Sequence, residues 1–70
     1  MNEPGKDGRI RNNIKVGLPV AVVQKQYQRT GELTEGAVAR ILTKSASHPH
    51  GIKVMLESGE VGRVKHILED

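Results

Sequence analysis

Apolar and polar side chains alternate most regularly between residues 52 and 57. Every second position there holds an aliphatic residue, namely Ile52, Val54 and Leu56. This period of two is typical of a strand with one buried face. The segment ends at Ser58-Gly59, and residues 60–64 are again rich in valine. The pattern therefore predicts a β-hairpin closed by a two-residue turn, in which the glycine supplies a positive φ.

The second strand of this hairpin cannot follow a simple ladder. A two-residue turn would pair Leu56 with Val61, but it would also place Arg63 opposite Val54 in the core. A bulge or kink at Gly62 would remove the conflict by turning both valines of the strand inward. We therefore expect Gly62 to bend the strand. The residues after it should close the chain as a turn plus a short strand, or as one helical turn.

A first strand is expected near residue 20. Four aliphatic residues at every second position share one face, namely Val16, Leu18, Val20 and Val22. Residues 24–36 are polar and contain the turn-forming pair Thr30-Gly31. We expect a long loop or a flexible hairpin there, with Leu33 as its anchor in the core.

Residues 37–44 are ambiguous, because their apolar positions fit both a helical stripe and a bulged strand. The short length and the glycine at the head of the segment favour a strand. A bulge near Ala39-Arg40 would turn both Val38 and Ile41 inward. A helix is the alternative.

These elements describe one small domain. Residues 1–9 contain glycine and proline among polar residues and are expected to form a flexible tail, followed by a single domain over residues 10–70. Residues 45–51 form a second loop around His48-Pro49-His50. Four to five short antiparallel strands with a long first loop are typical of a small SH3-like barrel, so the expected fold class is all-β. Such barrels are more often binding modules than enzymes, and this expectation rests on the fold class alone.

Composition limits the core and the kinds of partner. The chain has 70 residues, no cysteine, and a single aromatic residue, Tyr27. The core must therefore be aliphatic, and we expect it to contain Ile14, Val16, Leu18, Val20, Val22, Leu33, Val38, Ile41, Leu42, Ile52, Val54, Leu56, Val61, Val64, Ile67 and Leu68. Base stacking, methyl-lysine cages and proline-rich peptide grooves all require aromatic side chains that this chain lacks.

The start of the chain and its apolar runs bear on location. No apolar run approaches the roughly 20 residues that span a bilayer, and the polar start lacks the apolar centre of a secretory signal. We expect a cytoplasmic protein.

Positive charge is concentrated in the first part of the chain. Residues 1–29 hold six basic and two acidic residues, whereas residues 30–70 hold five basic and six acidic residues. A basic excess attracts polyanions because counterions are released on binding. The alternative is that these charges serve solubility alone.

Six motifs resemble those of a known family. They are Ile14-Lys15-Val16-Gly17, Gln28-Arg29-Thr30-Gly31, Leu33-Thr34-Glu35-Gly36, Ile41-Leu42-Thr43, His48-Pro49-His50-Gly51-Ile52-Lys53-Val54 and Val61-Gly62-Arg63-Val64. In this order they resemble the YwbE-like family of small uncharacterised proteins, over nearly all of residues 8–68. The resemblance implies a free-standing domain of this length and little about its chemistry. Gln26-Tyr27 and Met55 depart from the Lys-Asp pair and the Arg expected in relatives, so no family role is transferred to them.

Two loops and one strand could carry a function. In the first loop, Arg29 could bind a phosphate beside Lys25, with hydrogen bonds added by Thr30 and the Gly31 amide. The alternative is a turn that needs Gly31 for its conformation. After Gly62, Arg63 and Lys65 could form a basic stripe with Lys53, Lys25 and Arg29. The alternative for Arg63 is a surface ion pair with Glu57 or Glu60.

The second loop contains His48 and His50. A His-x-His spacing on an extended segment points both rings to one side, and His66 is the remaining histidine of the chain. A metal site would be weak without cysteine, so we expect no metal and no cofactor. Loop histidines that hydrogen-bond to the backbone are the favoured interpretation, and contact of either ring with nucleic acid is an intermediate one.

No nucleophile with a base, phosphate-binding glycine motif or paired carboxylates can be identified, so we expect a binding protein and not an enzyme. The hypothesis is binding of RNA or a ribonucleoprotein through phosphates with little sequence specificity. The residues expected to carry it are Lys25, Arg29, Lys53, Arg63, Lys65, His48 and His50. The rival is a protein-interaction or assembly module, such as a homodimer that pairs exposed strand edges.

Overall fold

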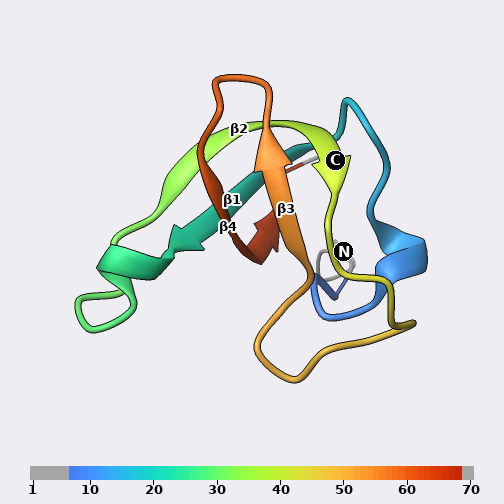
Figure 1. Ribbon diagram of the computed structural model, residues 1–70, viewed down its shortest axis with the longest axis horizontal. Helices are drawn as coiled ribbons and strands as arrows, with labels where there is room; N and C mark the ends of the chain where they lie inside the picture. The colour runs from blue at the N-terminus through green and yellow to red at the C-terminus, as the bar shows by residue number, and fades with distance from the viewer. Residues whose placement is uncertain (1–6, 69–70) are drawn as a thin grey trace, which may run out of the picture.

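Four antiparallel strands close into a barrel in the order β1-β2-β3-β4, with β4 pairing back onto β1. This is seen in a computed structural model of the protein, which describes residues 7–68 (Figure 1). The strands are β1 (Pro19–Gln24), β2 (Thr34–Ile41), β3 (Lys53–Leu56) and β4 (Val61–Ile67), and the two 3-10 turns are η1 (Arg11–Asn13) and η2 (Lys25–Tyr27). The predicted all-β class and small antiparallel barrel are confirmed. Within residues 7–68, no helix has the length and apolar character needed to cross a membrane.

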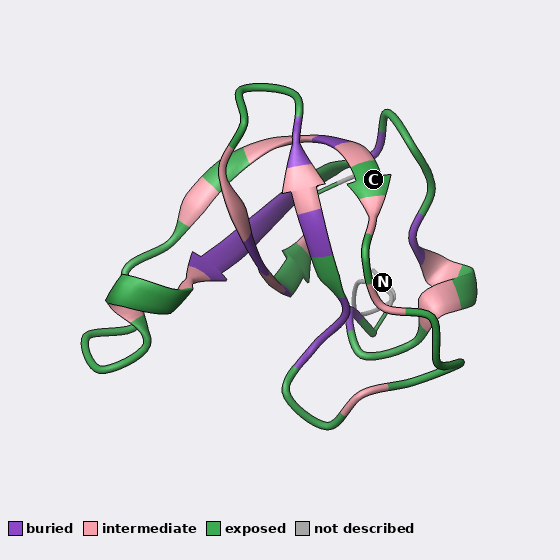
Figure 2. Cartoon of the chain, viewed as in Figure 1, coloured by how far each residue is buried: buried purple, intermediate pink, exposed green. Residues whose placement is uncertain are grey.

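The interior of the barrel is aliphatic, as predicted. Side chains with at most 1% exposure come from every strand and from the residue before β3, namely Val20, Val22, Val38, Ile52, Val54, Leu56 and Val64. Figure 2 shows most of the buried colour on β1, on β3 and on the residues just before β3, with the connecting loops mostly exposed. No polar or charged residue among those described is buried.

Four residues assigned to the core are exposed: Val16, Leu33, Leu42 and Leu68. Val16 is 68% exposed because the alternation does not extend back to it. Gly17 adopts φ +91° just before β1 and donates its N–H to the Val38 carbonyl, so the chain turns there. Leu33 lies outside β2 and does not anchor the long loop. Apolar residues at the ends of loops do not follow the strand period.

The strand predicted at residues 37–44 is confirmed, and the helix alternative is wrong, although β2 ends at Ile41. The predicted bulge is also present, because the register with β3 shifts between Val38↔Leu56 and Arg40↔Met55. Ala39 is thus the extra residue. The shift lets Val38 lie in the core and Ile41 pack against it.

The two-residue turn predicted for the last hairpin is wrong. Lys53 lies opposite Arg63 and Met55 opposite Val61, so the connection is a three-residue loop over residues 57–59. The Leu56 N–H donates to the Glu60 carbonyl at 2.7 Å. Gly59, with φ +102°, takes the left-handed position that such loops require at their last residue. The loop therefore uses the expected glycine but sets a different register.

The bulge predicted at Gly62 is wrong as well. Gly62 lies opposite Val54 in a regular ladder and faces inward, and Val61 faces outward opposite Met55. Gly62 is required by the neighbouring strand, since a Cβ there would lie 2.7 Å from the Val23 carbonyl oxygen.

The bulge in β4 lies three residues later. The pairing with β1 shifts between Val22↔Val64 and Ala21↔His66, which makes Lys65 the extra residue. The shift returns Ile67 to the core side, where it packs against the buried cluster. β4 is a continuous strand to Ile67, without a closing helical turn.

The body of the barrel begins earlier than predicted. Residues 1–6 of the predicted tail lie outside the described residues, but 7–9 do not form a tail. Gly8 is buried and its carbonyl accepts the Ile52 N–H at 3.0 Å, while the Arg9 carbonyl accepts the His48 N–H at 2.9 Å. Backbone pairing thus fastens this segment beside the loop that precedes β3.

Candidate nucleic-acid interface

Three outward positions form a row across the barrel wall. Arg63 on β4 is the register partner of Lys53 on β3 and of Val23 on β1. Register partners in antiparallel strands point to the same face, so the two cations are direct neighbours. The predicted placement of Lys53 and Arg63 on one outer wall is therefore correct.

Arg63 is held in place by a backbone carbonyl. Its Nη1 donates to the Gly51 carbonyl at 3.1 Å, and its side chain is half-buried. The alternative pairing with Glu57 or Glu60 is wrong, because the one ion pair within residues 7–68 joins Arg9 and Asp7 at 2.9 Å. The guanidinium keeps further N–H donors beyond the one used by Gly51.

The loop that supplies this carbonyl is a tight turn over residues 48–51. The Gly51 N–H donates to the His48 carbonyl at 3.0 Å, and Pro49 takes the turn position for which its fixed φ is suited. Gly51 adopts φ +103°, and a Cβ there would lie 2.4 Å from the Val64 carbonyl oxygen. Only glycine lets the turn approach β4 this closely, which explains why both histidines border the strand that carries Arg63.

A hollow of about 550 Å³ lies between this turn and the loop after η2. It is floored by Val23 and bordered by Gln28, Gly31, His48, His50, Arg63 and Lys65. We call it the central hollow. Among the residues that the structure describes, no aspartate or glutamate borders it.

The His48 ring is fixed by its own loop. The His50 N–H donates to His48 Nδ1 at 3.1 Å, so the neutral ring carries its proton on Nε2. Partial burial lowers the pKa of His48 below its ordinary value, and the charges of Arg63 and His50 act in the same direction. This is the backbone-bonded loop histidine that the sequence favoured. The two rings lie 5.8 Å apart between centroids.

A metal site receives no third ligand from these elements. His66 lies on β4 opposite Ala21, outside the central hollow. Within residues 7–68, no three histidine, aspartate or glutamate side chains come together as a possible metal site.

Two further hollows adjoin the central one. The first shares Gln28 and Arg63 with it and adds Lys25, Lys53 and the Glu60 carboxylate beside the last hairpin loop. The second shares His50 and Lys65 and adds Arg9 and Asp7. We call the three hollows together the basic groove. The Asp7 carboxylate is already bound by Arg9, whose hydrogen bonds lower the pKa of Asp7.

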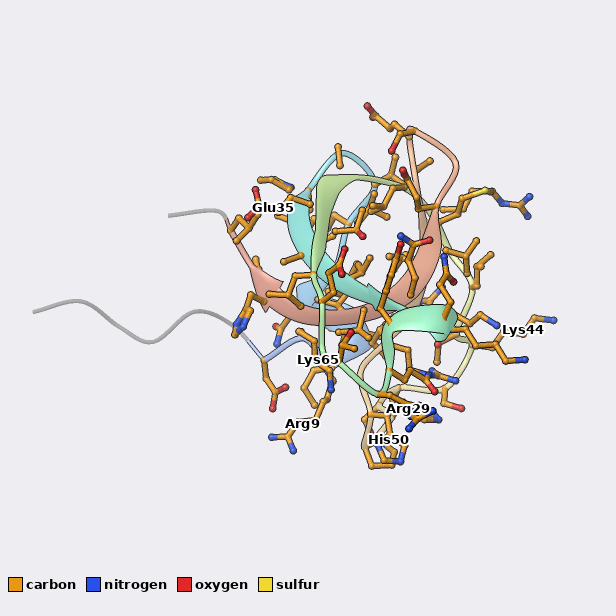
Figure 3. All side chains as sticks on the ribbon, turned by 90° about the vertical axis from the view of Figure 1, so that its left-hand side faces the viewer. Arg9, Arg29, Glu35, Lys44, His50 and Lys65 are labelled. Atoms are coloured by element: carbon orange, nitrogen blue, oxygen red, sulfur yellow. The ribbon has the colours of Figure 1, made fainter. Side chains whose placement is uncertain are left out.

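Six of the seven predicted residues border this groove: Lys25, His48, His50, Lys53, Arg63 and Lys65. Arg29 does not border these hollows, although its neighbours Gln28 and Gly31 do. In Figure 3, Arg29, His50, Lys65 and Arg9 all lie in the lower part of the view, whereas Glu35 lies at the upper left and Lys44 at the right.

Thr30 and Gly31 serve the loop itself. Both donate to the Tyr27 carbonyl, Thr30 Oγ1 at 3.3 Å and the Gly31 N–H at 2.8 Å. Gly31 adopts φ +76°. The turn alternative for this pair is therefore correct, and the Gly31 amide is not free for a phosphate.

Sequence reasoning missed two residues of the groove. Arg9 had been assigned to the tail, although its neighbour Gly8 packs against Val64. Gln28 belongs to the motif Gln28-Arg29-Thr30-Gly31, but the phosphate contact of this motif was predicted for Arg29. The usable signal for Gln28 was its position in the polar segment that follows β1 and η2, since β1 pairs with the strand that carries Arg63.

Comparisons with known proteins agree with the motifs. A family model described as "Uncharacterized conserved protein (DUF2196)" matches residues 7–67. The "Uncharacterized protein YwbE" of Bacillus subtilis (strain 168) is 55% identical over 62 residues, which cover 89% of this chain and 95% of that protein. No solved structure matches the chain. The resemblance inferred from the six motifs is confirmed.

Proposed function

The chain belongs to the family of uncharacterized conserved proteins named DUF2196, and we propose that it binds RNA or a ribonucleoprotein surface through phosphate contacts with little sequence specificity. The basic groove is the binding surface. Lys25, Lys53, Arg63 and Lys65 supply the charges, and His48 and His50 supply further hydrogen bonds. Arg29 reaches the ligand from the edge of the loop after η2.

The observation that supports this proposal is the direct pairing of Lys53 with Arg63 across β3 and β4. Like charges at opposed positions of a sheet destabilise it, and within residues 7–68 neither cation has an acidic partner. A phosphate oxygen between them would remove the repulsion and accept charge-assisted hydrogen bonds from both.

The composition of the groove favours the backbone of a nucleic acid over its bases. Tyr27 is the only aromatic residue of the chain, so stacking of successive bases has no platform. The described residues contain no helix longer than three residues that could enter the major groove of DNA. Phosphate contacts carry no sequence information, and binding should therefore tolerate many sequences.

Fluorescence anisotropy tests the proposal with labelled single-stranded RNA and DNA of 12 nucleotides at 50 and 200 mM salt. If about four phosphates are contacted, the fourfold rise in salt should weaken RNA binding by roughly 50-fold. The double variant Lys53→Gln/Arg63→Gln should lose most of the affinity. Absence of RNA binding by the wild-type protein at 50 mM salt would overturn the proposal.

A matched control is available on the other side of the barrel. The variant Arg40→Gln/Lys44→Gln removes the same charge from exposed residues that do not border the groove. It should retain nearly all of the RNA affinity. Equal losses in both double variants would indicate attraction to overall charge alone and would contradict a groove.

The rival, an assembly module that pairs strand edges, receives no support from the closed barrel, where each strand has a neighbour on both sides. Light scattering of the purified protein and a pull-down after nuclease treatment distinguish the two. Partners that survive nuclease would favour the rival.

A further inference from the structure

We propose that the central hollow binds a phosphate monoester, the group found at the end of an RNA chain or on a free nucleotide. This inference rests on the proposed function and specifies the chemical group that the middle of the basic groove selects. The flanking hollows then hold the internal phosphates of the chain.

The three hollows differ in their acidic residues. Glu60 borders the hollow on one side and Asp7 borders the hollow on the other, but no acidic residue among residues 7–68 borders the central hollow. It collects Arg63, Lys65 and two imidazoles instead. A phosphate monoester carries about −1.5 to −2 charges at pH 7, whereas an internal phosphodiester carries about −1. The hollow without a carboxylate is therefore the one suited to the more highly charged group.

Two donors of the central hollow are fixed before a ligand arrives. Arg63 is oriented by the Gly51 carbonyl, and Gly51 is itself held in the turn by the hydrogen bond from its N–H to the His48 carbonyl. His48 is oriented by the His50 N–H, which leaves Nε2–H as a donor on the neutral ring. The lowered pKa of His48 keeps the ring neutral near pH 7, so this donor needs no protonation. Donors held in place bind an anion with a smaller loss of conformational entropy.

Lys65 borders the same hollow and is the bulge residue of β4. As the extra residue between Val64 and His66, it has no register partner on β1, and its side chain is exposed. Bulges commonly redirect a side chain beside a functional site. Lys65 thus adds a second cation next to Arg63 on the same strand.

The size of the central hollow allows more than a phosphate. About 550 Å³ falls within the 300–1,000 Å³ typical of small-molecule sites. Val23 offers an apolar floor, and the Gln28 amide offers both a donor and an acceptor. These groups suit the sugar and base attached to the phosphate.

The test compares one RNA sequence of 12 nucleotides in three forms: 5′-phosphorylated, 3′-phosphorylated, and with hydroxyl groups at both ends. At 150 mM salt, a phosphorylated end should tighten binding at least fivefold. Uridine 5′-monophosphate and inorganic phosphate are added as competitors to distinguish the source. Displacement of end-phosphorylated RNA by the nucleotide at similar concentration supports the site and assigns it to free nucleotides, and displacement only at far higher concentration assigns it to chain ends.

Two single variants locate the effect. Lys65→Gln, an exposed change in the central hollow, should reduce the preference for a phosphorylated end to less than twofold. Lys25→Gln, in the neighbouring hollow, should weaken all three RNAs alike and leave the preference unchanged. The melting temperature of each variant is checked to confirm folding.

The outcomes separate this inference from the proposed function. Equal affinity of the wild-type protein for all three RNAs, with no displacement by the nucleotide, overturns the phosphate monoester site and leaves RNA binding intact. A preference that survives Lys65→Gln and is lost in Lys25→Gln also overturns it. Binding of none of the RNAs, at 50 mM salt as well, overturns the proposed function.

Discussion

The strands β2 and β4 are built alike but border different surfaces. They have eight and seven residues, each contains one bulge, and each places an arginine on the outer wall. The bulge of β2 is Ala39, and Arg40 beside it lies opposite Met55 and is exposed. The bulge of β4 is Lys65, and Arg63 lies opposite Lys53 between two loops.

This difference shows that strand geometry alone does not make a site. Each bulge brings a later apolar side chain of its strand back to the core side. This residue is Ile41 in β2 and Ile67 in β4. On β4 the loop after η2 and the turn 48–51 border the same wall and form hollows over it, whereas no residue of β2 lines any of the three hollows described above. The following predictions test how far the two strands differ.

The largest expected difference concerns the inward glycines of the two strands. Gly62→Ala in β4 would bring a Cβ within 2.7 Å of a backbone oxygen of Val23, whereas Gly36→Ala in β2 would meet the end of the Leu56 side chain at 3.1 Å. A backbone carbonyl shifts less easily than the end of a side chain to relieve such a close contact. Gly62→Ala should therefore lower the free energy of unfolding by about 2 kcal/mol, and Gly36→Ala by less than about 1 kcal/mol. Urea denaturation measures both, and equal losses would contradict the inferred close packing of β4 on β1.

The second difference concerns the arginines. Arg63→Gln should weaken RNA binding about tenfold, or about 1.4 kcal/mol, because a charge-assisted hydrogen bond is lost. Arg40→Gln should weaken it less than twofold. The slope of log Kd against the logarithm of the salt concentration should fall by about 0.7 for Arg63→Gln but not for Arg40→Gln.

Arg63→Lys sharpens this comparison. The lysine keeps the positive charge but lacks the planar guanidinium that can donate to the Gly51 carbonyl and to a phosphate at the same time. An intermediate loss of affinity is therefore expected. Full affinity in this variant would show that only the charge matters. A melting temperature measured alongside separates binding from stability.

The smallest expected effect lies in the turn beside β4. The folded chain holds the pKa of His48 below its ordinary value of 6.5, through burial and the nearby Arg63. The unfolded chain therefore takes up the proton more readily, so the contribution of His48 to stability is complete above pH 6.5. It is lost as pH falls through the lowered pKa. Protonation also removes the acceptor of the His50 N–H.

Thermal unfolding between pH 7.5 and 5 measures this contribution. His48→Gln should be less sensitive to acid than the wild-type protein. An NMR titration in which the His48 midpoint equals or exceeds 6.5 would contradict the prediction.

The two bulges also show how far the fold follows from the sequence. Val38 and Ile41 are three positions apart, and strict alternation cannot bury both, so a bulge between them could be predicted. In β4 the same spacing occurs twice, at Val61 and Val64 and at Val64 and Ile67. The choice between them depends on the hairpin register, which the length of the loop 57–59 determines. A turn taken one residue too short therefore placed the bulge at Gly62 instead of Lys65.

The candidate site, too, could be predicted only in part from the sequence. Period-two alternation was enough to place Lys53 on the outer wall, but Arg63 was placed there through the bulge wrongly predicted at Gly62. Residues 48–51 could be identified as a turn from Pro49 and Gly51. The pattern could not show that this turn docks on β4, because that depends on the absent Cβ of Gly51 next to Val64. The role of Arg9 was missed for a related reason, since its segment is held by backbone bonds from His48 and Ile52 that carry no side-chain pattern.

Tyr27 has an optical consequence. It is the only residue of the chain with appreciable near-ultraviolet absorbance and emission, since there is no tryptophan. It ends η2, and its carbonyl fastens the loop that borders the central hollow. Its emission can thus report changes in this loop without any label. Because one tyrosine absorbs so weakly at 280 nm, even a small amount of co-purified nucleic acid would dominate the absorbance spectrum of a preparation.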